Sequence, residues 1–119
     1  MKALFPELIT RLPEADIPLP GLTAFLAQAG NQQFVFMTFA EAVDVPEHTH
    51  EAQWGVILDG EIELTIAGVQ HLLKRGDSYT IPAGVKHSAR IKPGYKDLVC
   101  FDQKDMYSRK RENQPDINR

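Results

Sequence analysis

Three histidines stand where their imidazole groups could share a metal ion. His48 and His50 lie two residues apart, and on a β-strand residues i and i+2 project from the same face. Two imidazoles on one face can aim at one point, which a metal ion requires and a packed apolar core does not. His87 lies far along the chain, where a turn leads back into a strand-like segment. Surface pairs of histidines also occur, so a shared site needs a fold that brings His87 to the pair.

The other polar and aromatic candidates favour ordinary structural roles. His71 lies on a short segment bounded by turns, and we expect it to be exposed. Trp54 should pack in the core or in a dimer interface. Asp102 and Arg109 lie near a polar end of the chain and are expected to be solvated. Cys100 is interpreted as an ordinary buried thiol, because nothing near it in sequence would lower its pKa.

Short apolar or alternating segments, separated by turn residues, must position these side chains. Residues 61–67 alternate cleanly, with apolar side chains at 62, 64 and 66 on one face. The dipeptide Asp59-Gly60 is a signal for a type I′ hairpin turn. Roughly eight to ten short strands with almost no helix predict an all-β sandwich or barrel. Besides the segment that carries the histidine pair, the expected strands are 22–28, 33–40, 54–58, 61–67, 69–74, 78–81, 86–91 and 96–102.

The two ends of the chain differ in composition from this body. Residues 1–20 contain four prolines, which predict an extended arm or edge strand, with a short helical possibility around 6–12. Residues 21–102 hold the strands. Residues 103–119 are mostly polar and charged, and predict a helix or a loose tail. A chain of 119 residues fits one domain.

Charge and composition exclude several classes of partner. The formal net charge is −3, so there is no basic footprint for nucleic acid or an anionic membrane. The run 109–111 is basic but too short to indicate nucleic acid. No stretch approaches the roughly 18 apolar residues of a membrane span, and no secretory signal is visible at the N-terminus. The single cysteine excludes an intrachain disulfide. We therefore expect a cytoplasmic protein that binds neither nucleic acid nor membrane.

Two motifs resemble those of the cupin family. The segment 46–53, with His48, His50 and Gln53, is followed after six residues by Gly60, as in the first cupin motif. The segment 76–87, Gly-Asp-Ser-Tyr-Thr-Ile-Pro-Ala-Gly-Val-Lys-His, is similar to the second, and 15 residues separate Gly60 from Gly76. The resemblance implies a cupin double-stranded β-helix, or jelly-roll, barrel. It also implies that His48, His50 and His87 ligate one metal ion inside it.

Gln53 departs from the usual pattern, which has a glutamate at this place. Its amide oxygen can still coordinate as a neutral ligand, and we expect Gln53 to be the fourth protein ligand. Glu51 is the nearest carboxylate, but it does not share the spacing to Gly60. Three imidazoles and an amide leave the charge of a divalent ion uncompensated, which favours an anionic ligand. The donor set is compatible with Zn, Fe, Mn or Ni, and does not select among them.

The ligand set also resembles small cupins of pectin breakdown that open unsaturated uronate sugars. Those enzymes carry an Asp-x-Phe pair and a following arginine on the last strand. With Phe101 aligned to that phenylalanine, Val99 stands in place of the aspartate and Asp105 in place of the arginine. We therefore do not assign that activity. Phe101 and Tyr79 remain candidates for lining the pocket.

Function stays open among three alternatives, because the cupin fold hosts many reactions. One is a small metalloenzyme, an isomerase, oxygenase or lyase, that acts on an anionic or sugar-like metabolite through Lewis-acid or metal-bound-water chemistry. A second is a non-catalytic module that binds a metal or a small ligand. A third is a structural dimer with a vestigial site. The family resemblance also implies a homodimer, paired through an outer sheet and the N-terminal arm.

Overall fold

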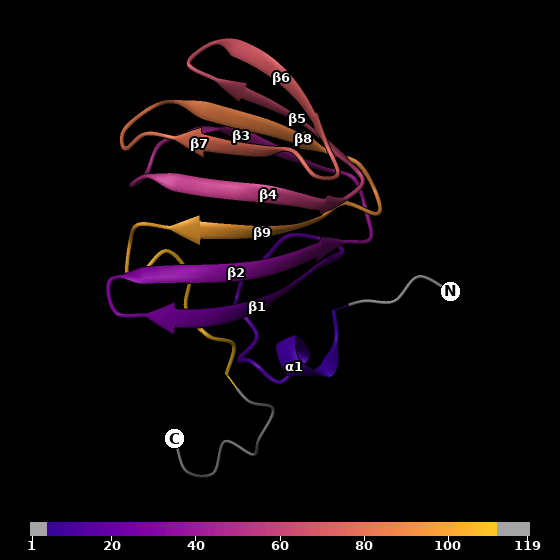
Figure 1. Cartoon of the computed structure of the whole chain (residues 1–119), viewed down its shortest axis with the longest axis vertical. Helices are drawn as coiled ribbons and strands as arrows, with labels where there is room; N and C mark the ends of the chain where they lie inside the picture. The colour runs from indigo at the N-terminus through magenta and orange to yellow at the C-terminus, as the bar shows by residue number, and fades with distance from the viewer. Residues whose placement is uncertain (1–4, 112–119) are drawn as a thin grey trace.

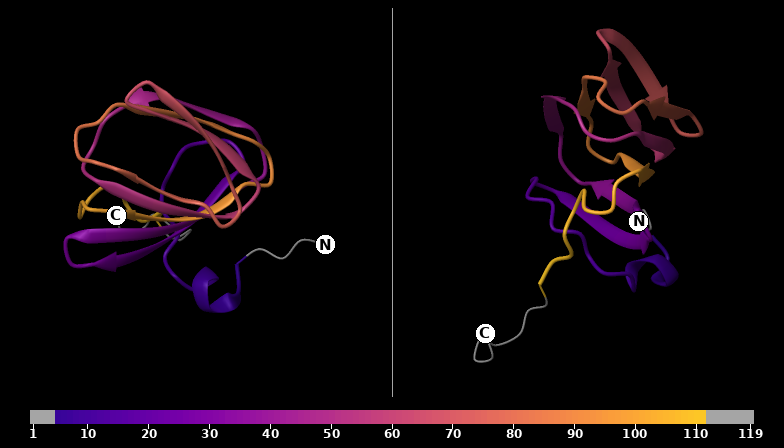
Figure 2. Two further views of the ribbon diagram at one scale, coloured as in Figure 1. Left: turned by 45° about the horizontal axis from the view of Figure 1, so that its top comes forward. Right: turned by 90° about the vertical axis from the view of Figure 1, so that its left-hand side faces the viewer.

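The computed structural model describes residues 5–111 and shows two antiparallel sheets that face each other around a barrel interior (Figures 1 and 2). The five-stranded sheet has the order β1-β2-β9-β4-β7, and the four-stranded sheet the order β3-β8-β5-β6. The all-β prediction is confirmed. The strands are β1 (Leu22–Ala29), β2 (Gln32–Phe39), β3 (Val43–His48), β4 (Gln53–Asp59), β5 (Glu61–Ile66), β6 (Val69–Lys74), β7 (Ser78–Ile81), β8 (His87–Ile91) and β9 (Lys96–Phe101).

The interior is built by alternation along the central strands of the larger sheet. In β9, Asp97, Val99 and Phe101 are buried while the residues between them are partly exposed. In β2 the buried residues are every second one from Gln33 to Phe39. Because side chains of a strand alternate between faces, these rows form one continuous inner surface. The sheet therefore has a clear inner side, which carries any site inside the barrel.

The connection at Gly60 differs from the hairpin turn that Asp59-Gly60 predicted. β4 and β5 belong to different sheets, and Asp59 has an ordinary negative φ, whereas Gly60 has φ +76°. A Cβ at Gly60 would lie 2.9 Å from Tyr95 Cα. The type I′ prediction is therefore wrong. The glycine serves a crossing between the sheets at a place of close backbone approach.

The N-terminal segment packs against the outside of the larger sheet. The short helical turn that the sequence predicted is α1 (Glu7–Thr10), which lies below β1 in Figure 1. Before it, Phe5 contacts Phe25 and Phe36 edge to face, with ring centroids 6.4 and 5.7 Å apart. No helix within residues 5–111 is long and apolar enough to cross a membrane.

The segment after β9 is held against the barrel by the buried amide of Gln33. Its Nε2 donates to the carbonyls of Lys104 and Tyr107 at 3.1 and 3.0 Å, and its Oε1 accepts from the Tyr107 amide at 3.0 Å. Residues 103–111 contain turns and a bridge between Ala15 and Arg109. Residues 103–111 contain no helix, and the hydrogen bonds to Gln33 anchor them against the barrel. The rest of the expected tail, 112–119, lies outside the described residues, and the division at 20 and 102 stays a prediction.

Candidate metal centre

His48, His50 and His87 come together at one end of the barrel. His48 is the last residue of β3 and pairs in register with His87, the first residue of β8. His50 follows in the connection to β4, so the pair of histidines does not lie on one regular strand as the sequence suggested. A register shift between Val45 and His48, at Pro46 on this edge strand, turns the backbone there. The potential ligand atoms of the three rings all lie within 4.8 Å of one another.

The Nδ1 atom of each histidine ring lies within hydrogen-bond distance of a backbone carbonyl oxygen. His48 Nδ1 is 2.8 Å from Pro46 O, His50 Nδ1 is 2.7 Å from Glu51 O, and His87 Nδ1 is 2.9 Å from Val85 O. A carbonyl can only accept, so each Nδ1 carries the proton and each Nε2 has a free lone pair. The same carbonyl contact fixes the orientation of ligating histidines in known metal sites.

The Nε2 atoms of His50 and His87 lie 3.1 Å apart. With both Nδ1 atoms protonated, two lone pairs face each other with no hydrogen between them. Nitrogens that share one ion at metal–nitrogen distances of about 2 Å lie about 3 Å apart, so the observed separation suits a common cation. Burial lowers the pKa of both rings, and the nearby His48 lowers it further. The rings are thus kept neutral, as ligands must be.

Gln53 begins β4 and lies on the wall of the same cavity. Its Nε2 donates a hydrogen bond to the Tyr79 hydroxyl at 2.8 Å, which leaves Oε1 as the atom available to an ion. The Tyr79 ring crosses the inner side of the sheet over Gly55, where a Cβ would lie 2.5 Å from the phenol. Gly55 therefore makes room for the tyrosine that orients Gln53.

The cavity beside the histidines has a volume of about 120 Å³. An apolar cavity of roughly 150 Å³ accommodates benzene, so this one fits a small molecule. Tyr79 and Phe101 are among its lining residues, and the Phe101 ring lies edge to face with His50 and with Tyr107, both at 5.5 Å. Tyr107 belongs to the segment that Gln33 anchors, so this segment completes the wall.

Asp97 is the functional candidate that sequence reasoning missed. Its side chain lines the cavity, and the residue is only 4% exposed. Burial raises its pKa to about 7, and interaction with the Tyr95 hydroxyl opposes that rise. Neither Asp97 Oδ1 nor the Tyr95 hydroxyl has a hydrogen-bond partner of ordinary geometry within the described chain. The sequence feature that could have revealed Asp97 is the alternation along β9, which places it on the same inward side as Val99 and Phe101.

Other candidates lie outside this centre. His71 is exposed on β6, as expected. Trp54 is 41% exposed on the outside of β4, so it is not a core residue within this chain. Asp102 and Arg109 are exposed. Cys100 is partly exposed rather than buried, because it faces outward on β9; partial burial raises its pKa, in line with an unreactive thiol.

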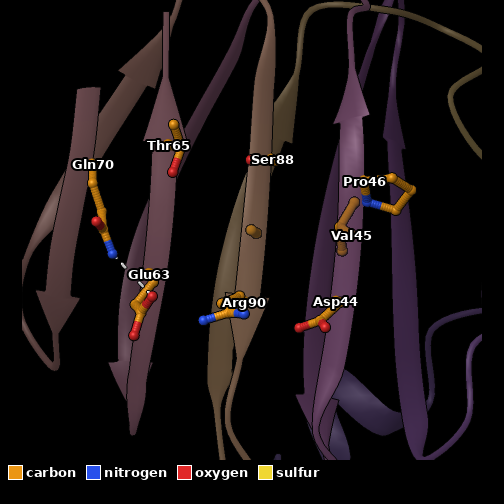
Figure 3. Close-up of a pocket in the computed structure, with 9 residues that line it drawn as sticks. Asp44, Val45, Pro46, Glu63, Thr65, Gln70, Ser88 and Arg90 are labelled. Atoms are coloured by element: carbon orange, nitrogen blue, oxygen red, sulfur yellow. Dashed lines mark hydrogen bonds between the residues drawn. The ribbon is translucent and has the colours of Figure 1, made fainter. Parts of the chain in front are cut away.

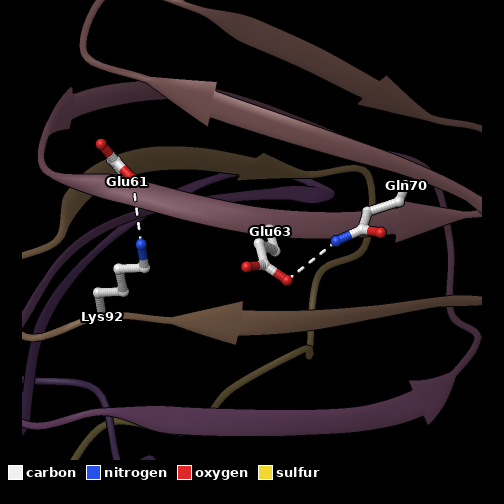
Figure 4. A network of polar contacts seen from close by, with 4 residues as sticks. All are labelled: Glu61, Glu63, Gln70 and Lys92. Atoms are coloured by element: carbon white, nitrogen blue, oxygen red, sulfur yellow. Dashed lines mark hydrogen bonds and ion pairs between the residues drawn. The ribbon is translucent and has the colours of Figure 1, made fainter.

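A broader hollow lies on the outer face of the smaller sheet and is polar. There Arg90 of β8 lies between Asp44 of β3 and Glu63 of β5, its register partners (Figure 3). Glu63 accepts a 2.9 Å hydrogen bond from Gln70 Nε2, and along the same face Lys92 pairs with Glu61 at 3.3 Å (Figure 4). Gln70 and Glu63, and Lys92 and Glu61, thus interact across neighbouring strands, and this outer face is separate from the histidines.

Comparisons with solved structures identify this architecture. An RmlC-like cupin from Shewanella frigidimarina superposes with a TM-score of 0.69 at 22% identity, covering 81% of this chain and 87% of that one. KdgF from Halomonas sp. gives 0.66 at 22% identity, covering 76% and 87%. Oxalate decarboxylase of Bacillus subtilis, a protein with Mn(II) centres, gives 0.61 at 24% identity, covering 72% and 26%. Identities this low establish the fold and no activity.

Sequence comparison gives the family. Quercetin 2,3-dioxygenase of Bacillus subtilis is 35% identical over 74 residues, which are 60% of this chain. The chain spans only 22% of that relative's length. The profile of the cupin domain matches residues 35–102, a range that contains all four candidate ligands. The protein is a cupin with a three-histidine cluster that fits a single metal ion, and the chain belongs to the cupin domain family.

Proposed function

We propose that this cupin is a small metalloenzyme that binds one divalent ion through His48, His50 and His87, with Gln53 as fourth ligand. The observation that carries the proposal is the convergence of three Nε2 atoms whose Nδ1 atoms are all tied to backbone carbonyls. A structural histidine cluster does not require all three rings to aim an unprotonated nitrogen at one point. A metal site does.

The ligand is proposed to be a small anion or a sugar-like metabolite. Imidazole and amide ligands are neutral, so they leave both positive charges of the ion to be met by something that enters the cavity. No lysine or arginine is among the described residues that line the cavity. An anion would therefore bind there chiefly through the ion itself.

An enzyme is favoured over a binding module because titratable groups reach the same cavity. Asp97 and the hydroxyl of Tyr79 face inward, and burial disfavours the charged form of each. Groups of this kind are typical of sites that move protons. The alternative is a non-catalytic metal or ligand sensor, which the mostly apolar lining of the cavity supports.

The bound ion, whether Zn, Fe, Mn or Ni, would act as a Lewis acid toward an oxygen of the ligand and would position it. The chain's own residues would do the rest. The carbonyls of Pro46, Glu51 and Val85 hold the imidazoles, and Tyr79 holds Gln53. Phe101 contacts the His50 ring edge to face and adds an apolar wall beside it.

The test is elemental analysis of the protein purified without added metal, followed by calorimetry with small carboxylates and sugars. One equivalent of a divalent ion, and a ligand whose binding disappears when the ion is removed, would support the proposal. Absence of metal after loading with Zn²⁺ and Mn²⁺ would reject it. A ligand that binds but is never converted would favour the sensor.

We further propose that the protein forms a homodimer through the outer face of the five-stranded sheet. Leu98 and Val56 lie side by side there, as register partners on β9 and β4, next to Phe36 of β2, which Phe5 contacts. Trp54 and Leu58 extend this apolar row and are 41% and 37% exposed. A second copy presents the same surface, which suits a two-fold contact.

The cytoplasm is the proposed location, since Cys100 is the only cysteine in the sequence and no disulfide can form within the chain. Subcellular fractionation with an antibody to the protein would test it. Recovery in the soluble intracellular fraction is expected, and recovery elsewhere would reject this location.

A further inference from the structure

Asp97 lies deep in the cavity, away from the histidines, on the inward row of β9. Phe101, four residues along the strand, is the residue of that row that contacts His50. At a rise of about 3.3 Å per residue, the Cα atoms of Asp97 and Phe101 are separated by about 13 Å along β9. Both side chains line the same cavity. The cavity therefore has two different polar ends, a metal-binding end and a carboxyl end.

The carboxyl end lacks a counter-charge. The titratable groups that face Asp97 are Tyr79 of β7, Tyr95 of the turn before β9 and Tyr107 of the segment after β9. The strands on either side of it contribute Met37 and Ile57, which are apolar. The three histidines lie at the opposite end of the cavity, and burial lowers the pKa of two of them, His50 and His87. An ionised carboxylate among these groups would be buried without a cation, which is strongly unfavourable.

One oxygen of the Asp97 carboxyl group also lacks a hydrogen-bond partner of ordinary geometry among the described residues. Asp97 is 4% exposed, and its Oδ1 makes no hydrogen bond within the described residues. Buried polar atoms are almost always paired in folded proteins, and an exception calls for a cause such as a missing ligand. A protonated carboxyl group that lines a cavity offers one hydrogen to whatever enters, and an oxygen of the ligand is the natural acceptor.

We propose that protonated Asp97 is the distal binding group of the pocket, and that the ligand is a short oxo acid. The carboxylate of the ligand would meet the metal, and its carbonyl oxygen would accept a hydrogen bond from Asp97. The proposal rests on the metal centre proposed above and adds the class of ligand to it. A ketone is favoured over a second carboxylate, because the apolar walls would leave a second negative charge without compensation.

The proposal couples binding to a proton. Below the pKa of Asp97 the ligand binds to the protonated protein with no net proton change. Above it, each binding event takes up one proton from solvent onto the carboxylate. With a pKa of about 7, the protonated fraction of Asp97 falls about 30-fold between pH 6 and pH 8.5, so most of the affinity that its hydrogen bond adds for an oxo acid is lost over this range.

The experiment compares two probes that differ only at the distal end, 4-oxopentanoate and pentanoate. Calorimetry is done on the metal-loaded protein at pH 6 and 8.5. At pH 6 the wild type is expected to prefer 4-oxopentanoate about tenfold, a gain of the size that one hydrogen bond provides. Asp97→Leu should remove this preference, so that the two probes bind with about equal affinity. Equal preference in wild type and Asp97→Leu would overturn the proposal.

Asp97→Asn is the matched control, because its amide keeps a donor that does not titrate. It should bind 4-oxopentanoate at both pH values and lose the steep fall that the wild type shows. The same fall in both proteins would assign the pH effect to the metal centre and reject the role of Asp97.

A spectroscopic measurement separates the two proposals even if Asp97→Leu does not fold. Metal-free wild type at pH 6 should show the infrared carbonyl band of one buried carboxylic acid, absent in Asp97→Asn, since exposed aspartates are ionised at that pH. Absence of the band would overturn the role of Asp97 and leave the metal centre standing. Presence of the band in a protein that never binds metal would reject the metal centre instead.

Discussion

His50 and His87 face each other through Nε2 atoms 3.1 Å apart, while the Nδ1 atom of each ring bonds a backbone carbonyl. The two carbonyls belong to Glu51 and Val85, residues one and two positions from the histidines themselves. A backbone carbonyl close in sequence therefore helps to set the orientation of each ring. A site built in this way is prepared for its ion before the ion arrives.

Removal of any one of the three histidines should release the ion. His48→Ala, His50→Ala and His87→Ala each leave a divalent ion with two imidazoles, so we expect metal content to fall from one equivalent to below about a tenth after dialysis. Elemental analysis measures this directly. His71→Ala is the matched control, since His71 is exposed on β6 and should retain the full equivalent. Equal metal content in all four variants would refute the assignment.

Gln53→Glu tests the neutral fourth ligand. A carboxylate in place of the amide adds a negative charge next to the ion, so we expect divalent binding to tighten by about tenfold or more. The same charge cancels part of the attraction for an anionic ligand, whose affinity should fall. Competition with a metal-sensitive chelator gives the first quantity and calorimetry gives the second. If neither affinity changes, Gln53 does not contact the ion.

Tyr79→Phe tests the residue that orients Gln53. Loss of the hydroxyl leaves Gln53 Nε2 without its 2.8 Å partner, and loss of such an outer contact commonly costs 10- to 100-fold in metal affinity, so a reduction of about tenfold is expected. The same chelator competition measures it, with the apo protein's melting temperature as control for folding. Unchanged metal affinity would show that the Gln53–Tyr79 bond has no part in the centre.

Gly55→Ala should weaken the site through the same tyrosine. The added methyl group would lie 2.5 Å from the Tyr79 ring, so the ring must move and release Gln53. We expect about 1–3 kcal/mol of lost stability from the forced contact, together with weaker metal binding. Gly55→Ala combined with Tyr79→Ala removes the clash. If the double variant is less stable than the Tyr79→Ala variant with Gly55 intact, other contacts of Gly55 dominate.

The histidines and most strands could be predicted because their signals are local. A period of two residues fixes the face of a strand, as in residues 61–67, and fixed spacings around Gly60 and Gly76 mark the two motifs. The type I′ turn at Asp59-Gly60 failed because a dipeptide reports local preference only. Whether the flanking strands pair with each other is decided by the whole barrel. Here β4 pairs with β7 and β9, and β5 pairs with β6 and β8.

Asp97 and the anchored C-terminal segment escaped prediction for a different reason. A charged residue on a strand is normally solvated, and only the register of β9 between β2 and β4 makes position 97 inward. Residues 103–111 are mostly polar, a composition that suggests a loose tail. Gln33 nevertheless anchors this segment, because it binds backbone groups that any sequence would provide. Contacts to backbone leave no trace in the composition of the segment that makes them.

Trp54→Lys tests the proposed homodimer. A charge at position 54 of the apolar row on β4 would be buried in a two-fold contact, so we expect the variant to be monomeric while the wild type is dimeric in sedimentation equilibrium. Val69→Lys is the control, because Val69 is 58% exposed on the other sheet. It should remain dimeric. A wild type that is monomeric at high concentration, or a Trp54→Lys dimer of unchanged strength, would reject this interface.

Asp97→Asn should stabilise the metal-free protein, and the gain should depend on pH. Burial raises the pKa of Asp97 from 3.8 to about 7, so between these values the folded state holds a proton that the unfolded state releases. Stability from this group is then present in full below pH 3.8 and is lost as pH rises to about 7. The asparagine variant does not titrate. We expect its advantage in urea unfolding to grow from near zero at pH 4 to a few kcal/mol at pH 8, at about 1.4 kcal/mol per pKa unit. The lowered pKa values of His50 and His87 have the opposite dependence, but both proteins share them and they cancel in the difference. An advantage that is the same at pH 4 and pH 8 would show that Asp97 is not held protonated by its surroundings.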